Sequence, residues 1–90
     1  GPATLLALAL DNAANGAISY FKAWNNVNPT VGTTAPDLVL LLPASARRVF
    51  YCYGGIKFGT GISFAAVTAG GTAGTTNPTS NVDGTLVLTE

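Results

Sequence analysis

AISYFKAW, residues 17–24, alternates between two sets of side chains, as is typical of a β-strand. One set is Ala17, Ser19, Phe21 and Ala23, and the other is Ile18, Tyr20, Lys22 and Trp24. A lysine ammonium is not expected in a core, so we expect Phe21 to face inward and Tyr20 and Trp24 to face outward beside Lys22. Two large rings on an outer face need a cover. That cover could be a sugar, another chain, or a loop of this chain.

Beyond this stretch, the chain consists of apolar runs of strand length separated by Gly, Asn, Pro and Thr. These further runs are Thr4–Leu10, Asp37–Leu42, Arg47–Tyr53, Ile56–Phe58, Ile62–Thr68 and Thr85–Thr89. Eleven glycines and five prolines interrupt every window of helical length. The sequence therefore predicts an all-β fold, namely a single antiparallel β-sandwich, immunoglobulin-like or jelly-roll-like, with about seven or eight strands.

The connections between these runs carry their own signals. Asn15-Gly16 predicts a hairpin turn because both residues tolerate positive φ, and Gly54-Gly55 predicts a turn or a bulge. Residues 25–36 and 69–84 are long loops rich in Gly, Thr and Asn, and we expect them to contact neighbouring subunits. Gly1-Pro2, with no Met, is interpreted as the remnant of a cleaved tag, which leaves residues 3–90 as one sandwich domain.

The composition argues against most kinds of chemistry. Charged residues make up 9% of the chain, where about 25% is usual, and the net charge is zero, so no basic patch for nucleic acid is expected. With no His and one Cys, the chain offers no catalytic triad and no zinc cluster, and we expect no enzyme activity, metal or cofactor. The single thiol, Cys52, is expected to be buried and inert. The apolar runs are far shorter than a membrane span.

The leucine-rich strands suggest partner chains, because residues 4–10 and 37–42 are apolar on both faces. One sandwich has one inner layer, so the second face needs another subunit or a covering segment such as residues 25–36. The adjacent Arg47 and Arg48 point to opposite sides of a strand, where one could pair with Asp37 or with a partner's acid, or both could be solvated. The expected interface residues are Tyr20, Trp24, Leu38, Leu40, Leu42, Arg47 and Arg48.

Five further stretches form a recognisable set, namely Ser19–Lys22, Asn28–Pro36, the leucine strand ending at Pro43-Ala44, Gly54–Ser63 and Ala73–Thr76. Together they resemble small structural proteins of tailed-bacteriophage virions. The resemblance covers most of residues 3–90 in outline. It implies a β-sandwich head decoration (cement) protein or tail-accessory protein, and it carries over no catalytic residues.

From this resemblance we expect a virion protein on the capsid surface, made in the cytoplasm of the bacterial host. Its expected partners are the major capsid protein and further copies of itself, most simply as a homotrimer. The role would be to bridge neighbouring capsid subunits. The alternative is a tail or tail-fibre module that binds a host receptor or glycan, with Tyr20 and Trp24 as a stacking platform for sugar rings.

Overall fold

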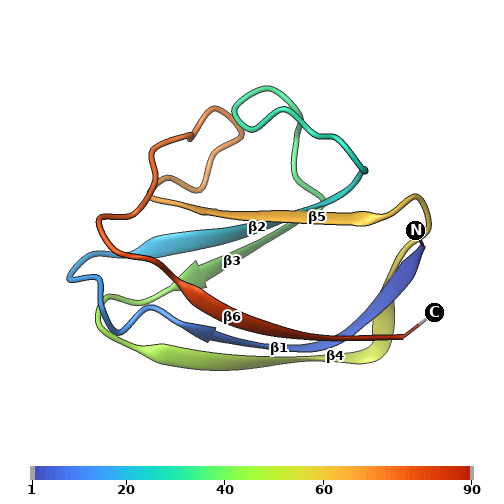
Figure 1. Cartoon of the computed structure of the whole chain (residues 1–90), viewed down its shortest axis with the longest axis horizontal. Helices are drawn as coiled ribbons and strands as arrows, with labels where there is room; N and C mark the ends of the chain where they lie inside the picture. The colour runs from blue at the N-terminus through green and yellow to red at the C-terminus, as the bar shows by residue number, and fades with distance from the viewer. Residues whose placement is uncertain (1, 90) are drawn as a thin grey trace.

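Two antiparallel sheets of three strands each face one another in the computed structural model, which describes residues 2–89 (Figure 1). The strands are β1 (Ala3–Asp11), β2 (Ser19–Asn25), β3 (Leu38–Leu42), β4 (Arg47–Phe58), β5 (Ile62–Val67) and β6 (Asp83–Thr89). Sheet A has the order β4-β1-β6 and sheet B the order β3-β2-β5. The described residues contain no helix, so the all-β prediction is confirmed, and the two sheets fit a sandwich. Gly1 of the expected tag remnant and Glu90 of the expected domain lie outside the described residues.

The core lies between the two sheets, and the strand alternation of the sequence builds it. β1 contributes Leu5, Leu8 and Leu10 from one side, and β2 contributes Phe21 and Ala23 from the other. All of these side chains are at most 4% exposed. The predicted inward orientation of Phe21 is therefore confirmed. Burying a leucine or phenylalanine completely contributes about 1.5–3 kcal/mol, which makes this apolar layer the main source of stability.

The chain passes between the sheets at nearly every connection. Within the described residues, only the connection from β2 to β3 joins neighbouring strands of one sheet. The hairpin predicted at Asn15-Gly16 is therefore wrong, because β1 belongs to sheet A and β2 to sheet B. Neither Asn15 nor Gly16 has a positive φ. The turn carries the chain across the sandwich.

Two buried asparagines hold the crossing turns together. The side chain of Asn12 is fully buried, and its Nδ2 donates to the carbonyl oxygens of Ala17 at 3.1 Å and Pro43 at 3.0 Å. Its Oδ1 accepts a hydrogen bond of 2.9 Å from Nδ2 of Asn15. Asn15 in turn bonds the backbone of Ser80, donating to its oxygen at 3.0 Å and accepting from its nitrogen at 2.8 Å. These contacts join three turns that are far apart in sequence.

Strand β4 merges two of the expected strands into one bent strand. Between the pairs Ala7–Tyr51 and Leu5–Ile56, β4 contains residues 52–55 where β1 contains only Leu6. Gly54 and Gly55 both have φ of 80°, a conformation that favours glycine. The Gly54-Gly55 signal is thus a bulge, and the residues that the structure describes form six strands in place of the expected seven or eight.

Candidate interaction surface

Two long loops of the same chain cover the centre of the outer face of sheet B, over β2. Residues 26–37 and the first part of the loop 68–82 lie above this face in Figure 1, and the last part of that loop runs down beside sheet B to β6. Trp24 is 1% exposed, and its Nε1 donates to the carbonyl oxygen of Thr34 at 2.9 Å. Lys22 is fully buried, and its Nζ donates to the carbonyl oxygens of Gly71 at 2.5 Å and Gly74 at 3.3 Å. The loops therefore supply the polar partners that these buried donors require.

This covering corrects the expected role of the aromatic pair. Tyr20, Lys22 and Trp24 do share the outer face of β2, but their cover is the chain's own loops and not a sugar or another chain. Trp24 has no surface left for a sugar or a partner chain. Tyr20 is half-buried beside Gly70, where an added Cβ would lie 3.0 Å from the tyrosine ring. A glycan platform of Tyr20 and Trp24 is therefore closed in this structure.

The expected interface residues of β3 also face the other way. Leu42 is 1% exposed within the core, and Leu38 and Leu40 pack against the core from the edge of sheet B. The register explains their direction, because Leu40 lies opposite the inward-facing Phe21. The outward residues of β3 are Val39 and Leu41, which are 40% and 49% exposed. The predicted interface residues Leu38, Leu40 and Leu42 therefore face the core, and it is their neighbours Val39 and Leu41 that face outward.

The two arginines lie exposed at the start of β4. Arg47 Nε contacts Asp11 Oδ2 at 3.0 Å, so its acidic neighbour is Asp11 and not Asp37. Such an exposed pair contributes about 0–1 kcal/mol. Arg48 donates from Nη1 to the carbonyl oxygen of Arg47 at 2.8 Å. Both side chains remain accessible to a partner. Cys52 of the same strand is half-buried against the core, less enclosed than expected.

The outer face of sheet A differs from that of sheet B because its apolar side chains are exposed across all three strands and not only at one edge strand. The register places Tyr51, Ala7 and Val87 in one row across the three strands, and Val49, Ala9 and Thr85 in the next. Tyr51 is 69% exposed, Val49 56% and Val87 50%. Leu6 beside them is 39% exposed, and Tyr53 in the bulge of β4 is 96% exposed. We call this face, with Leu6, Ala7, Ala9, Val49, Tyr51, Thr85 and Val87, the outer apolar face.

Charges flank the outer apolar face but do not cross it. Arg47, Asp11 and Asp83 form the row at one end, and Lys57 lies opposite Thr4 at the other. The residues named for the face itself are all uncharged. A partner could therefore bury the face without removing an ion from water, which is the costly step in forming a polar interface. The sequence indicates the outer apolar face through the alternating Val49, Tyr51 and Tyr53, but these residues are not among the predicted interface residues.

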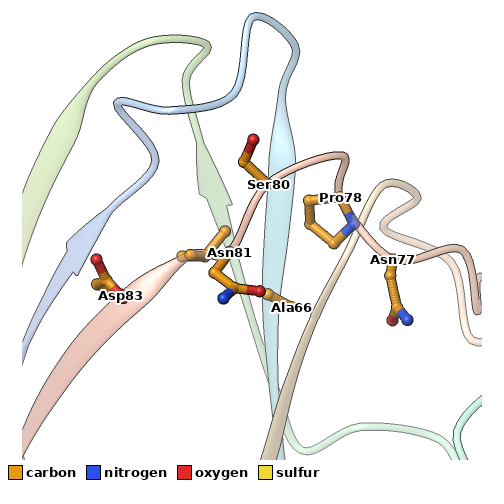
Figure 2. Close-up of a pocket in the computed structure, with 7 residues that line it drawn as sticks. Ala66, Asn77, Pro78, Ser80, Asn81 and Asp83 are labelled. Atoms are coloured by element: carbon orange, nitrogen blue, oxygen red, sulfur yellow. The ribbon is translucent and has the colours of Figure 1, made fainter.

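A groove opens at the side of the sandwich, between β5 and β6. Its volume is about 380 Å³, and it is lined by Phe21, Phe64, Ala65, Ala66, Val82, Gly84 and Leu86, with Asp83 as the charged residue of the lining. A more polar hollow of about 470 Å³ continues from it along the loop before β6, lined by Ala66, Asn77, Pro78, Ser80, Asn81, Val82 and Asp83. Figure 2 shows this hollow with most of its residues labelled. We call the first cavity the β5–β6 groove.

Neither a metal-binding cluster nor a membrane-spanning helix is found within residues 2–89. Residues 2–89 contain no group of three or more His, Cys, Asp or Glu side chains placed to hold a metal ion. The described chain also has no helix that is long and apolar enough to cross a membrane. Comparison with protein-family models, with curated proteins and with solved structures finds no match for this chain.

Proposed function

We propose that this protein is a non-enzymatic structural component of bacteriophage particles, a capsid decoration protein that docks through its outer apolar face and bridges neighbouring capsid subunits. The observation that carries the docking role is the difference between the two sheets. The chain covers the centre of the outer face of sheet B, at Lys22 and Trp24, with its own loops and leaves only its edge strand β3 partly exposed, whereas Val49, Tyr51 and Val87 on sheet A are 50–69% exposed. The virion setting rests on the sequence resemblance.

The chemistry of the outer apolar face suits a permanent contact with another protein. Covering the exposed half of a valine or tyrosine on this face contributes about 1 kcal/mol, so a few such residues give several kcal/mol. Aromatic residues such as Tyr51 are enriched at the centres of interfaces. A protein that bridges two capsid subunits holds its second contact at a high effective concentration once the first has formed, so each single contact can be modest.

The experiment uses particles of a phage that encodes this sequence. Mass spectrometry of purified particles should detect the chain, and cryo-electron microscopy should place it on the capsid with sheet A toward the shell. Particles that lack the chain would overturn the proposal, and a position on the tail would favour the receptor-binding alternative.

A pair of variants then tests the face itself. Tyr51→Glu puts a charge in the middle of the outer apolar face and should reduce incorporation into particles roughly tenfold or more. Val27→Glu is the matched control, because Val27 is 67% exposed but lies in the loop that covers sheet B. Equal incorporation of the two variants would show that docking does not use this face.

A further inference from the structure

Strand β6 lies at an edge of sheet A with one side of its backbone free. It pairs with β1 along its length, and no other backbone hydrogen bond to it is found within residues 2–89. Proteins usually protect such an edge with charges, prolines or bulges. Residues 84–89, GTLVLT, contain no charge and no proline, and the extra residue of the β1–β6 bulge, Leu6, belongs to β1. β6 is therefore open to pairing with another strand.

The opposite edge of sheet A is protected. β4 begins with Arg47 and Arg48, carries Lys57 near its end, and bends at Gly54-Gly55. A second strand could not follow it without a break at the bulge. The contrast between the two edges of one sheet singles out β6.

The same side of the molecule leaves part of the core uncovered. Phe64 lies opposite the inward-facing Ala23 in the register and stacks on Phe21 with a centroid distance of 5.9 Å. It is nevertheless 54% exposed, because sheet A ends at β6 and leaves the β5–β6 groove open. One more strand beside β6 would cover this groove with its inward side chains.

We propose that this strand is β6 of a second copy of the chain, paired antiparallel about a two-fold axis near Leu86. The inward positions of β6 are Gly84, Leu86 and Leu88, so the second copy would direct two leucines toward the open groove. Asp83 of each copy would lie at the far end beside Thr89 of the other, and the two carboxylates stay apart. Parallel pairing would bring these carboxylates together, and it is therefore disfavoured.

The pairing goes beyond the proposed function, since it uses an edge of sheet A and not its outer face. It makes sheet A continuous across two copies, and the two outer apolar faces then form one surface. An interface of one strand pair and one groove lies at the low end of specific interfaces, roughly 1,200 Å² in total or less. We therefore expect a reversible dimer with a micromolar dissociation constant, in place of the trimer expected from the sequence.

Light scattering and sedimentation of the pure protein measure this dimer over a range of concentrations. The double variant Thr85→Lys/Val87→Lys places cations opposite one another across the two-fold pairing, because residues 85 and 87 of the two copies face each other there. Both positions are exposed, so the variant should fold, and its dissociation constant should rise roughly tenfold or more. The matched control is Val49→Lys/Tyr51→Lys, which makes the same change in the same two rows on the β4 edge. It should leave the dimer intact.

Hydrogen exchange of the unmodified protein gives a second measurement that needs no variant. Alternate backbone amides of β6 point away from β1, and these should become protected as the concentration rises, while amides at the β4 edge should not. A monomer at every concentration, a trimer, or equal loss of association in both double variants would overturn the pairing. None of these outcomes bears on incorporation into particles, so failure here is distinguishable from failure of the proposed function.

Discussion

Replacing Asn12 by alanine should be among the most destabilising single changes in this chain. Its side chain is fully buried and donates to the carbonyl oxygens of Ala17, Leu42 and Pro43, while its Oδ1 accepts from Asn15. Each hydrogen bond contributes about 1 kcal/mol net, and a buried group left without a partner costs about 1–3 kcal/mol more. The contact to Leu42 is long at 3.4 Å, so we count three bonds.

The three bonds contribute about 3 kcal/mol, and the unpaired groups add at most about 1 kcal/mol, because the freed carbonyl groups are only partly buried and Asn15 Nδ2 keeps its bond to Ser80. The expected loss for Asn12→Ala is therefore about 3–4 kcal/mol. A domain of this size has a total stability of roughly 5–13 kcal/mol, so the loss is a large fraction of it. At about 4–8 °C per kcal/mol, a loss near 3 kcal/mol lowers the melting temperature by roughly 12–24 °C. Asn12→Asp keeps the shape but turns a carboxylate oxygen toward the carbonyl groups, so it should destabilise at least as much at neutral pH.

Thermal and urea unfolding followed by circular dichroism measure both variants. Asn77→Ala is the control, because Asn77 is an exposed asparagine in the loop before β6 and should change stability by no more than about 0.5 kcal/mol. A loss below about 1 kcal/mol for Asn12→Ala would refute the idea that this side chain holds the turns together.

Three further experiments test other parts of the structure. Gly55→Ala should cost about 2 kcal/mol or more in unfolding experiments, since the added Cβ would collide with Thr4 Cγ2, whereas Gly54→Ala has free space and should cost about 1–2 kcal/mol. Lys22→Met should speed hydrogen exchange in residues 68–76, because it removes the bonds to Gly71 and Gly74; the global loss should stay below about 2 kcal/mol, since it also removes a buried charge. The emission of Trp24 should be blue-shifted and resist quenching by acrylamide, and strong quenching would show that the loop does not cover it.

The sequence predicts which side of a strand faces the core where polar and apolar residues alternate along the strand. It does not predict this where the whole strand is apolar. In β2, Lys22 fixes which side is outward, and Phe21 is found inside as expected. In β3, all five residues are apolar, so the sequence contains no information about which face is inside. Pairing with β2 sets that phase through the contact of Leu40 with Phe21, and this is a tertiary effect.

The prediction of a hairpin at Asn15-Gly16 was wrong for a related reason. The hairpin signal describes which φ angles the two residues tolerate, but it does not say which strands are neighbours. Here the inward leucines of β1 and the inward Phe21 of β2 face each other across the core, so the two strands belong to different sheets. Asn15 serves instead as a buried hydrogen-bonding residue that reaches Ser80, a partner that no local pattern could have indicated.

The low charge of the chain has two separate explanations on the two outer faces. On sheet B, the uncharged Gly- and Thr-rich loop 68–82 covers the face, and its carbonyl groups satisfy the ammonium of Lys22 without any acid. The long loops were expected to contact other subunits, but their inner surfaces contact sheet B of the same chain. On sheet A, no loop of the described chain takes this role, although its face is equally poor in charge. A face that lacks both charge and a cover of its own is the one that a partner protein would have to complete, which is why both proposals concern sheet A.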